Sequence, residues 1–268
     1  MADVLYLSVR LTLLLSLFPL SIMETPLPDI TDQQFIESCV NEHNRARASV
    51  NPPASNMRYM TWDESLAVLA RSWARGCLFQ HNLQRKHPVL PSVGENIWAG
   101  TLSGSFNVKS AIKSWVQEVR YYNYYTSACS SPPCTHYTQV VWATTYKVGC
   151  AVIFCPNGVR DTTFSHRPGA IFVCNYATQG NYRDTRPYKE GAACSECGGE
   201  KCEDKLCHNS TRDTDIHNSW TSDWDPALHV CGVFCKSVLI IRPVALLLIF
   251  GSVYVVQRTC PNIFAYIN

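Results

Sequence analysis

The sequence carries little charge. Only 16% of its 268 residues are Asp, Glu, Lys or Arg, and the formal net charge is +2. This balance gives no electrostatic argument for a nucleic acid, an acidic substrate or another polyanion, and we expect no nucleic-acid partner. The sequence also shows no internal repeat and no low-complexity tract. With 46% hydrophobic residues it can bury one large core or two small ones.

Two hydrolase signatures are missing as well. There is no Gly-x-Ser-x-Gly motif, which would expose a nucleophilic serine on a sharp turn. There is also no His-Glu-x-x-His motif, which would place two zinc ligands and a base on one helix face. The sequence therefore favours a non-enzymatic protein.

Cysteine, in contrast, is abundant. Thirteen of the 14 cysteines follow residue 70, and several are closely spaced. Disulfides persist in oxidising compartments, whereas a cytosolic chain would keep free thiols or metal sites. This usage favours the secretory pathway or the cell surface.

Residues 1–21 predict a signal peptide. Arg10 precedes the short apolar run 11–20, and Ser21 supplies a small residue for cleavage. The run is too short for an ordinary membrane-spanning helix. Because the residues after Ser21 make a poor cleavage site, an uncleaved anchor is the alternative.

A second apolar run, residues 238–256, approaches the roughly 20 residues that cross a bilayer. Arg242 can snorkel to the headgroups, and Pro243 lies near the helix start, where a missing donor is tolerated. We predict a single-pass transmembrane helix with a short tail, 257–268, and the preceding domain extracellular or lumenal. The alternative is a cleaved lipid-anchor signal, but such a signal ends in its apolar tail.

Between these two runs, hydrophobic periodicity predicts three amphipathic helices, which extend from Thr31 to about Arg47, from Asp63 to Gly76, and over 108–121. Thr31 and Asp63 are the expected N-caps of the first two. Two apolar segments, 148–154 and 170–176, indicate buried strands.

The composition changes after Pro187. Segment 188–208 has almost no apolar residue and cannot form a core of its own. Its four cysteines suit either two disulfides or a zinc site, and the oxidising compartment favours disulfides. Residues 209–229 are polar and irregular, and we predict a stalk over 209–236, with an N-glycosylation sequon at Asn209.

Four motifs mix core, cysteine and polar side chains: His43-Asn44-Arg45-Ala46-Arg47, Gly94-Glu95-Asn96-Ile97, His136-Tyr137-Thr138-Gln139-Val140-Val141-Trp142, and Ile171-Phe172-Val173-Cys174-Asn175-Tyr176 followed by Gly180-Asn181-Tyr182. In this order they resemble the signature motifs of the CAP superfamily of cysteine-rich secretory, antigen 5 and pathogenesis-related proteins. The cysteine-rich hinge and the second apolar run make the chain most similar to the membrane-anchored glioma pathogenesis-related branch.

The resemblance implies an α+β fold, a three-layer α-β-α sandwich over residues 31–187. It also implies five disulfides: Cys77–Cys155, Cys150–Cys174, Cys129–Cys134, and, in the hinge, Cys194–Cys202 and Cys197–Cys207. Cys39 lies on the apolar face of its helix and is expected to be a buried free thiol. Cys231, Cys235 and Cys260 remain, and Cys260 is the better lipidation candidate.

The family's cleft of two histidines and two acids maps onto His81, Glu95, Glu118 and His136. Two imidazoles with carboxylates nearby form a ligand set that Zn²⁺ accepts. The alternative is structural, with the same groups hydrogen-bonding the backbone and each other. A zinc-bound water with a glutamate base would give a weak hydrolase.

The chain departs from the family pattern at Thr135, which stands where glycine usually precedes the histidine, and at Thr178-Gln179 before Gly180. Because glycine adopts backbone angles that threonine does not, Thr135 predicts an altered presentation of His136 and weaker metal binding.

The resemblance therefore implies an extracellular binding module for a protein or a lipid, such as a sterol or fatty acid. The aromatic run from Tyr121 to Tyr125 is a candidate contact surface, and the alternative is that its tyrosines merely cover the core. The family's channel-blocking activity needs a further cysteine-rich domain, so we do not expect it here.

Overall fold

A computed structural model describes residues 27–101, 106–214 and 233–260, without the side chains of 233–239. The chain divides into two units, Met1–Ser222 and Asp223–Asn268. The predicted signal peptide, most of the predicted stalk and tail, and Cys231 lie outside the described residues.

A four-stranded sheet forms the centre of the first unit. Its order is β1 (Thr61–Trp62), β5 (Lys147–Cys155), β6 (Gly169–Ala177) and β2 (Gly94–Thr101), with only β1 and β5 parallel. The predicted strands 148–154 and 170–176 are the two central strands, and β6 is buried along its whole length. Strand β2 was not predicted, because its first residues are polar and do not alternate.

The helices depart from the sequence predictions mainly at their ends. Helix α2 (Gln33–Ala48) is capped by Asp32, whose carboxylate accepts a hydrogen bond from the Phe35 amide, and not by Thr31. Helix α3 (Glu64–Ala74) has the predicted cap, since the Asp63 carboxylate accepts from the Leu66 amide.

The third predicted helix, 108–121, is two elements. It consists of helix α4 (Val108–Val116) followed by a 3₁₀ helix, η1 (Gln117–Tyr121). A short helix that was not predicted, α5 (Thr135–Val140), lies in the third sequence motif. A two-stranded ribbon, β3 (Tyr122–Asn123) with β4 (Ala128–Cys129), connects these helices.

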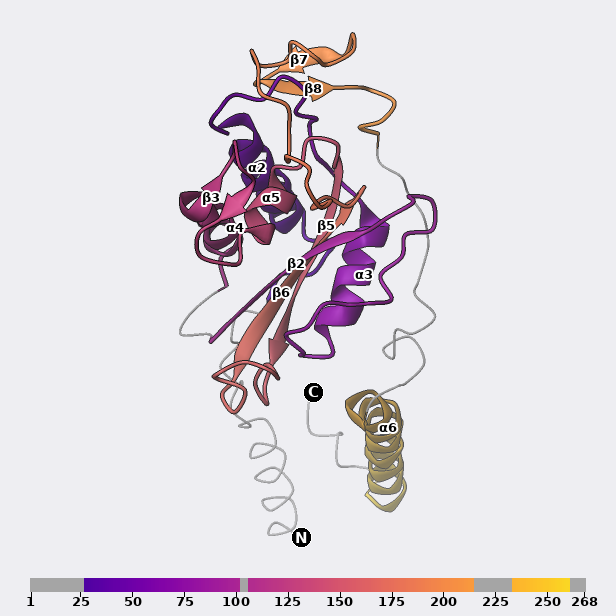
Figure 1. Ribbon diagram of the computed structural model, residues 1–268. Helices are drawn as coiled ribbons and strands as arrows, with labels where there is room; N and C mark the ends of the chain where they lie inside the picture. The colour runs from indigo at the N-terminus through magenta and orange to yellow at the C-terminus, as the bar shows by residue number, and fades with distance from the viewer. Residues whose placement is uncertain (1–26, 102–105, 215–232, 261–268) are drawn as a thin grey trace. The chain divides into compact units, whose positions relative to one another are not determined.

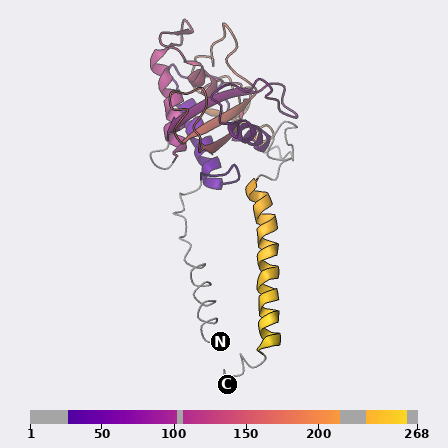
Figure 2. The same ribbon diagram turned by 90° about the horizontal axis from the view of Figure 1, so that it is seen from below.

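Side chains of β5 and β6 alternate between two buried clusters, one on each face of the sheet. Ala151, Ile171 and Val173 pack in one cluster with α3, whereas Val152 and Phe172 pack in the other with α2, α4 and α5. Figures 1 and 2 show these helices on opposite sides of the strands. A Cβ atom on Gly149 of β5 would overlap the backbone of α3, so this glycine permits the close approach of helix and sheet.

The structure contains five disulfides, in the pairing that the resemblance implies: Cys77–Cys155, Cys129–Cys134, Cys150–Cys174, Cys194–Cys202 and Cys197–Cys207. Cys150 and Cys174 are directly opposite on β5 and β6. Cys39 is buried and unbonded, and burial raises the pKa of its thiol well above the ordinary value. A neutral buried thiol is inert, so Cys39 acts as a small apolar side chain.

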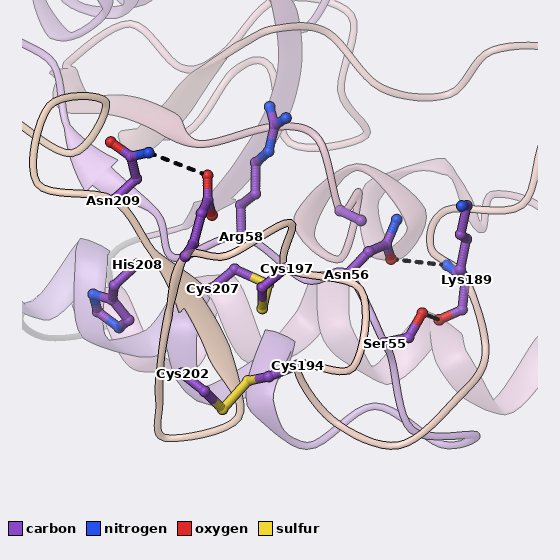
Figure 3. The surroundings of a disulfide bond; sticks show 12 residues. Ser55, Asn56, Arg58, Lys189, Cys194, Cys197, Cys202, Cys207, His208 and Asn209 are labelled. Atoms are coloured by element: carbon purple, nitrogen blue, oxygen red, sulfur yellow. Dashed lines mark hydrogen bonds between the residues drawn. A yellow bond between two sulfur atoms is a disulfide. The ribbon is translucent and has the colours of Figure 1, made fainter.

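The cysteine-rich hinge lies on the first unit and shares its core. Its ribbon, β7 (Lys201–Glu203) with β8 (Leu206–His208), is held by two disulfides (Figure 3). Tyr188 and Leu206 are buried in the cluster of α2, and the Cys207 amide donates to the Met57 carbonyl. The segment lacks a core of its own, as predicted, but it contributes two side chains to that of the domain.

The predicted stalk, 209–236, begins with an ordered turn. The Asn209 side chain accepts from the amides of Thr211 and Arg212 and donates weakly to Glu200 (Figure 3). Arg212 pairs with Glu200 through both carboxylate oxygens. The fully buried Lys147 ammonium donates to the Thr214 carbonyl, which fixes the start of this segment to the sheet.

The second unit contains one long helix, α6 (Val233–Thr259), with Pro243 inside it. Its segment Ile240–Thr259 has a mean hydropathy of 1.9 and is long and apolar enough to cross a membrane. This segment overlaps the predicted span, 238–256.

Arg47, on the last turn of α2, is 1% exposed, and its side chain hydrogen-bonds the backbone at the end of the third motif. Its guanidinium donates to the Arg58 carbonyl and to four carbonyls at and after the end of α5, those of Val140, Trp142, Ala143 and Thr145. Burial and the nearby Arg212 and Arg58 lower the pKa of Arg47 to about 9, so it is charged at neutral pH. The backbone carbonyls thus replace the water that would otherwise solvate the guanidinium charge.

His43, one turn earlier, anchors a buried chain of hydrogen bonds. Its Nδ1 donates to the Cys39 carbonyl, so its Nε2 accepts from the Tyr176 hydroxyl at 2.9 Å. Asn96 donates to this hydroxyl and to the His136 carbonyl. The chain links α2, β6 and β2 to the first residues of α5.

Replacing Arg47 with Lys is expected to reduce the free energy of unfolding by about 3 kcal/mol or more, because an ammonium cannot reach five carbonyls and leaves buried acceptors unpaired. The measurement is denaturant unfolding of the purified protein. Arg45→Lys is the control, since Arg45 is exposed and forms a surface ion pair with Glu42, and its change should be below about 0.5 kcal/mol. Equal losses for the two variants would contradict this role.

His43 should make the protein less stable in mild acid. Burial lowers its pKa to about 4, below the ordinary value of 6.5. Its stabilising contribution is therefore complete above pH 6.5 and is lost as the pH falls towards 4, by about 1.4 kcal/mol per pH unit. Between pH 7 and pH 5 the wild type should lose about 2 kcal/mol more than His43→Gln in denaturant unfolding. Parallel pH profiles would show that His43 does not titrate in this way.

Candidate functional site

The four predicted site residues come from four separate segments and form two His–Glu pairs. His81 follows α3, and its Nδ1 lies 2.8 Å from Oε1 of Glu95 on β2. His136 is on α5, and its Nδ1 lies 2.6 Å from Oε1 of Glu118 on η1. The structure thus brings each histidine to one acid.

One cleft of about 310 Å³ contains both histidines. His81, Glu95 and His136 line it, whereas Glu118 lies behind His136. The other lining residues are mainly polar: Arg85, Gly94, Asn96, Thr135, Gln139, Gln179, Gly180 and Asn181. The His81 side chain is 55% exposed and that of His136 is 20% exposed, so both rings are accessible from solvent.

Glu118 caps helix α5 from outside the helix. Cys134 precedes α5 and supplies no side-chain cap. Instead, Oε2 of Glu118 accepts from the amides of His136 and Tyr137, each at 3.1 Å. A carboxylate is favourable at these free amides. Glu118 therefore orients the His136 ring and stabilises the helix that carries it.

Glu95 is buried and only half satisfied. Its Oε1 accepts from the Asn82 amide and from His81, whereas Oε2 has no hydrogen-bond partner among the described residues. The side chain is 0% exposed. A buried carboxylate oxygen without a donor costs free energy, so this atom is an acceptor that the described residues leave unsatisfied.

The pairing determines which ring nitrogen of each histidine is free. Since a carboxylate only accepts, each Nδ1 donates its proton to the paired acid, and in a neutral imidazole Nε2 then keeps its lone pair. Neither Nε2 has a hydrogen-bond partner in the part of the chain that the structure describes. A carboxylate on the distal nitrogen is the usual support of a metal-ligating histidine. The two carboxylates thus orient the imidazole rings through Nδ1 and leave each Nε2 free for other partners.

Within the described ranges, no group of three or more His, Cys, Asp or Glu side chains is arranged to hold a metal ion. A metal in this cleft would have two imidazole ligands and take the rest from water or a ligand. The weak zinc-dependent hydrolase is not supported, since both acids are already bonded to imidazole.

Two polar residues that were not singled out as site residues, Gln139 and Asn96, shape the cleft. Gln139 accepts from the Gly180 amide, and a Cβ atom on Gly94 would overlap the Gln139 side chain. Asn96 holds the His136 carbonyl. Both residues lie within the four sequence motifs, and that position was the sequence signal that could have identified them as cleft residues. Thr135 is the first residue of α5 and has no positive φ, and the altered presentation of His136 stays a prediction.

Comparison with known proteins agrees with this arrangement. The family model "Cysteine-rich secretory protein family", CAP, matches residues 40–176. Mouse glioma pathogenesis-related protein 1 is 43% identical over 248 residues, covering 91% of each chain. Human GLIPR1-like protein 1 is 44% identical over 187 residues, covering 68% of this chain and 74% of its own.

Two solved structures share the fold. Na-ASP-1 is 27% identical with a TM-score of 0.55, covering 70% of this chain and 50% of its own. NaASP2 with Zn²⁺ is 25% identical with a TM-score of 0.53, covering 68% of this chain and all of its own. The four motifs, the disulfides and these relatives show that the chain belongs to the CAP family of cysteine-rich secretory proteins.

Proposed function

We propose that this chain is a membrane-tethered, extracellular CAP-domain binding module that engages a protein or a lipid, such as a sterol or fatty acid, without catalysis. The observation that carries the proposal is the cleft, in which two imidazoles present free Nε2 atoms from a disulfide-bonded frame. Such convergent polar groups in a concave site are typical of ligand binding.

The domain organisation supports this placement. We propose the α-β-α sandwich for residues 31–187, because buried clusters lie on both faces of the sheet. The hinge, 188–208, and the stalk, 209–236, would separate it from a span within α6, where Ile240–Thr259 has the required length and hydropathy. The sequon at Asn209 suits an extracellular stalk, and the exposed Cys260 lies just beyond the span, where palmitate attaches.

The cleft fits Zn²⁺ through His81 and His136, whose Nδ1 protons are held by carboxylates. The related structure of NaASP2 contains Zn²⁺, which supports this proposal. Bound zinc would supply a positive charge that accepts a carboxylate or carbonyl oxygen of a ligand. Glu118 orients His136 and Glu95 orients His81, so both rings are pre-organised for binding.

Zinc should bind the wild-type protein in calorimetric titration and should fail to bind the double variant His81→Ala plus His136→Ala. Glu118→Gln should weaken zinc binding by about 10- to 100-fold, because it removes the negative partner of His136. His166→Ala is the matched control, since His166 is exposed and lies outside the cleft. Identical heats for the wild type and the double variant would remove the zinc proposal and leave the tether untouched.

Full-length chain expressed in cells should remain in the membrane pellet after alkaline extraction, whereas a chain that ends at residue 222 should appear in the medium. The matched full-length control is Leu248→Asp plus Ile249→Asp, two exposed positions of the span. Each aspartate near the centre of a span costs about 2.5 to 3.5 kcal/mol on insertion scales, so this variant should lose the anchor. Release of the wild-type chain to the medium would refute the tether.

A further inference from the structure

A second cavity, of about 560 Å³, shares no lining residue with the histidine cleft. Tyr122, Tyr124, Tyr125 and Tyr137 line it, and we call it the tyrosine pocket. It lies beside the C-terminal ends of α2 and α4, and its remaining lining residues are uncharged: Ala46, Ser49, Val50, Asn51, Pro52, Val116, Val119 and Asn123. The pocket is thus aromatic and neutral.

The four rings form two pairs, and the two rings of each pair stand at a steep angle to one another. The Tyr122 and Tyr137 centroids are 5.9 Å apart with an interplanar angle of 57°, and those of Tyr124 and Tyr125 are 5.5 Å apart at 85°. Each ring face carries partial negative charge. Burial raises the pKa of Tyr137 to about 12, so at neutral pH its attraction for a cation comes from the ring face and not from a phenolate.

The same run of tyrosines already binds cations of the chain itself. The Arg186 guanidinium lies 5.2 Å from the Tyr124 centroid, and the Arg120 guanidinium lies 5.6 Å from that of Tyr121. These distances are those of cation–π contacts. Neither arginine lines the pocket. Because Tyr124 is already covered by Arg186 and stacks on Tyr188, the rings left for a ligand are those of Tyr122, Tyr125 and Tyr137.

We propose that the tyrosine pocket binds an organic cation of the quaternary ammonium type, as in choline or a choline headgroup. A strongly hydrated cation would need a carboxylate to replace its water, and no carboxylate lines the pocket. A trimethylammonium group is weakly hydrated, and aromatic cages are its usual binding site. Val116 and Val119 supply apolar contacts for its methyl groups. The inference does not depend on zinc or on the histidine cleft.

The test is a titration of the purified protein with choline, followed by NMR shifts of the tyrosine rings. The control ligand is 3,3-dimethylbutan-1-ol, which has the shape of choline with a carbon in place of the charged nitrogen. Choline should bind at least about 10-fold more tightly, because only the charged ligand gains the cation–π attraction. Equal binding of the two, or no shift with choline, would overturn the proposal.

Variants test the walls of the pocket. Tyr125→Leu and Tyr122→Leu should each weaken choline binding about 5- to 10-fold, whereas Tyr125→Phe and Tyr122→Phe keep a ring face and should retain it. Tyr125 is 60% exposed, so its replacement leaves the fold intact. Tyr182→Leu, at an exposed tyrosine outside the pocket, should change nothing. If the Phe and Leu variants bind equally, the ring faces are not the binding element.

The source of the ammonium group can be separated in the same system. Phosphatidylcholine vesicles that bind the protein and are displaced by free choline identify a lipid headgroup. Choline binding without vesicle binding identifies a soluble ligand. Binding to the vesicles that persists in Tyr125→Leu and is not displaced by choline would contradict a role for the pocket.

Discussion

The buried guanidinium of Arg47 is the interaction on which the cleft depends. It joins the end of α2 to the Arg58 carbonyl and to four buried carbonyls at and after the end of α5. Helix α5 has only six residues and no side-chain cap of its own, and isolated helices of this length are unstable in water. Arg47 at one end and Glu118 at the other supply the partners that the helix lacks, so His136 is held by tertiary contacts.

The sheet supplies the rigid frame around this helix. Side chains that alternate along β5 and β6 pack into two buried clusters, one on each face of the sheet. The Cys150–Cys174 disulfide joins the two strands. The hinge adds a second constraint, because Tyr188 and Leu206 enter the core and the Lys147 ammonium donates to the Thr214 carbonyl. The first residues of the predicted stalk are therefore part of the domain.

Elements with local apolar periodicity were predicted from the sequence, and those held by distant groups were not. Helix α3 has its own apolar stripe and its own cap in Asp63, so both the helix and its cap could be predicted from the sequence. Strand β2 and helix α5 depend on Glu118, Arg47 and the sheet, which have no local signature. The resemblance located the two acids of the cleft, but the sequence cannot show that each acid bonds Nδ1 of a histidine from a distant segment. Arg47 and Lys147 were missed as core residues, because charged side chains are rarely fully buried.

The 3₁₀ helix η1 lies between the two candidate sites and belongs to both. Glu118 bonds His136 in the histidine cleft, while the next residue, Val119, lines the tyrosine pocket. The same alternation occurs on α5, where His136 lines the cleft and Tyr137 lines the pocket. Glu118 also accepts from the Tyr137 amide, so one carboxylate of η1 holds both residues of α5. If a ligand in the pocket displaces η1, it must change the geometry of His136, and by linkage a metal in the cleft must change the affinity of the pocket by the same factor.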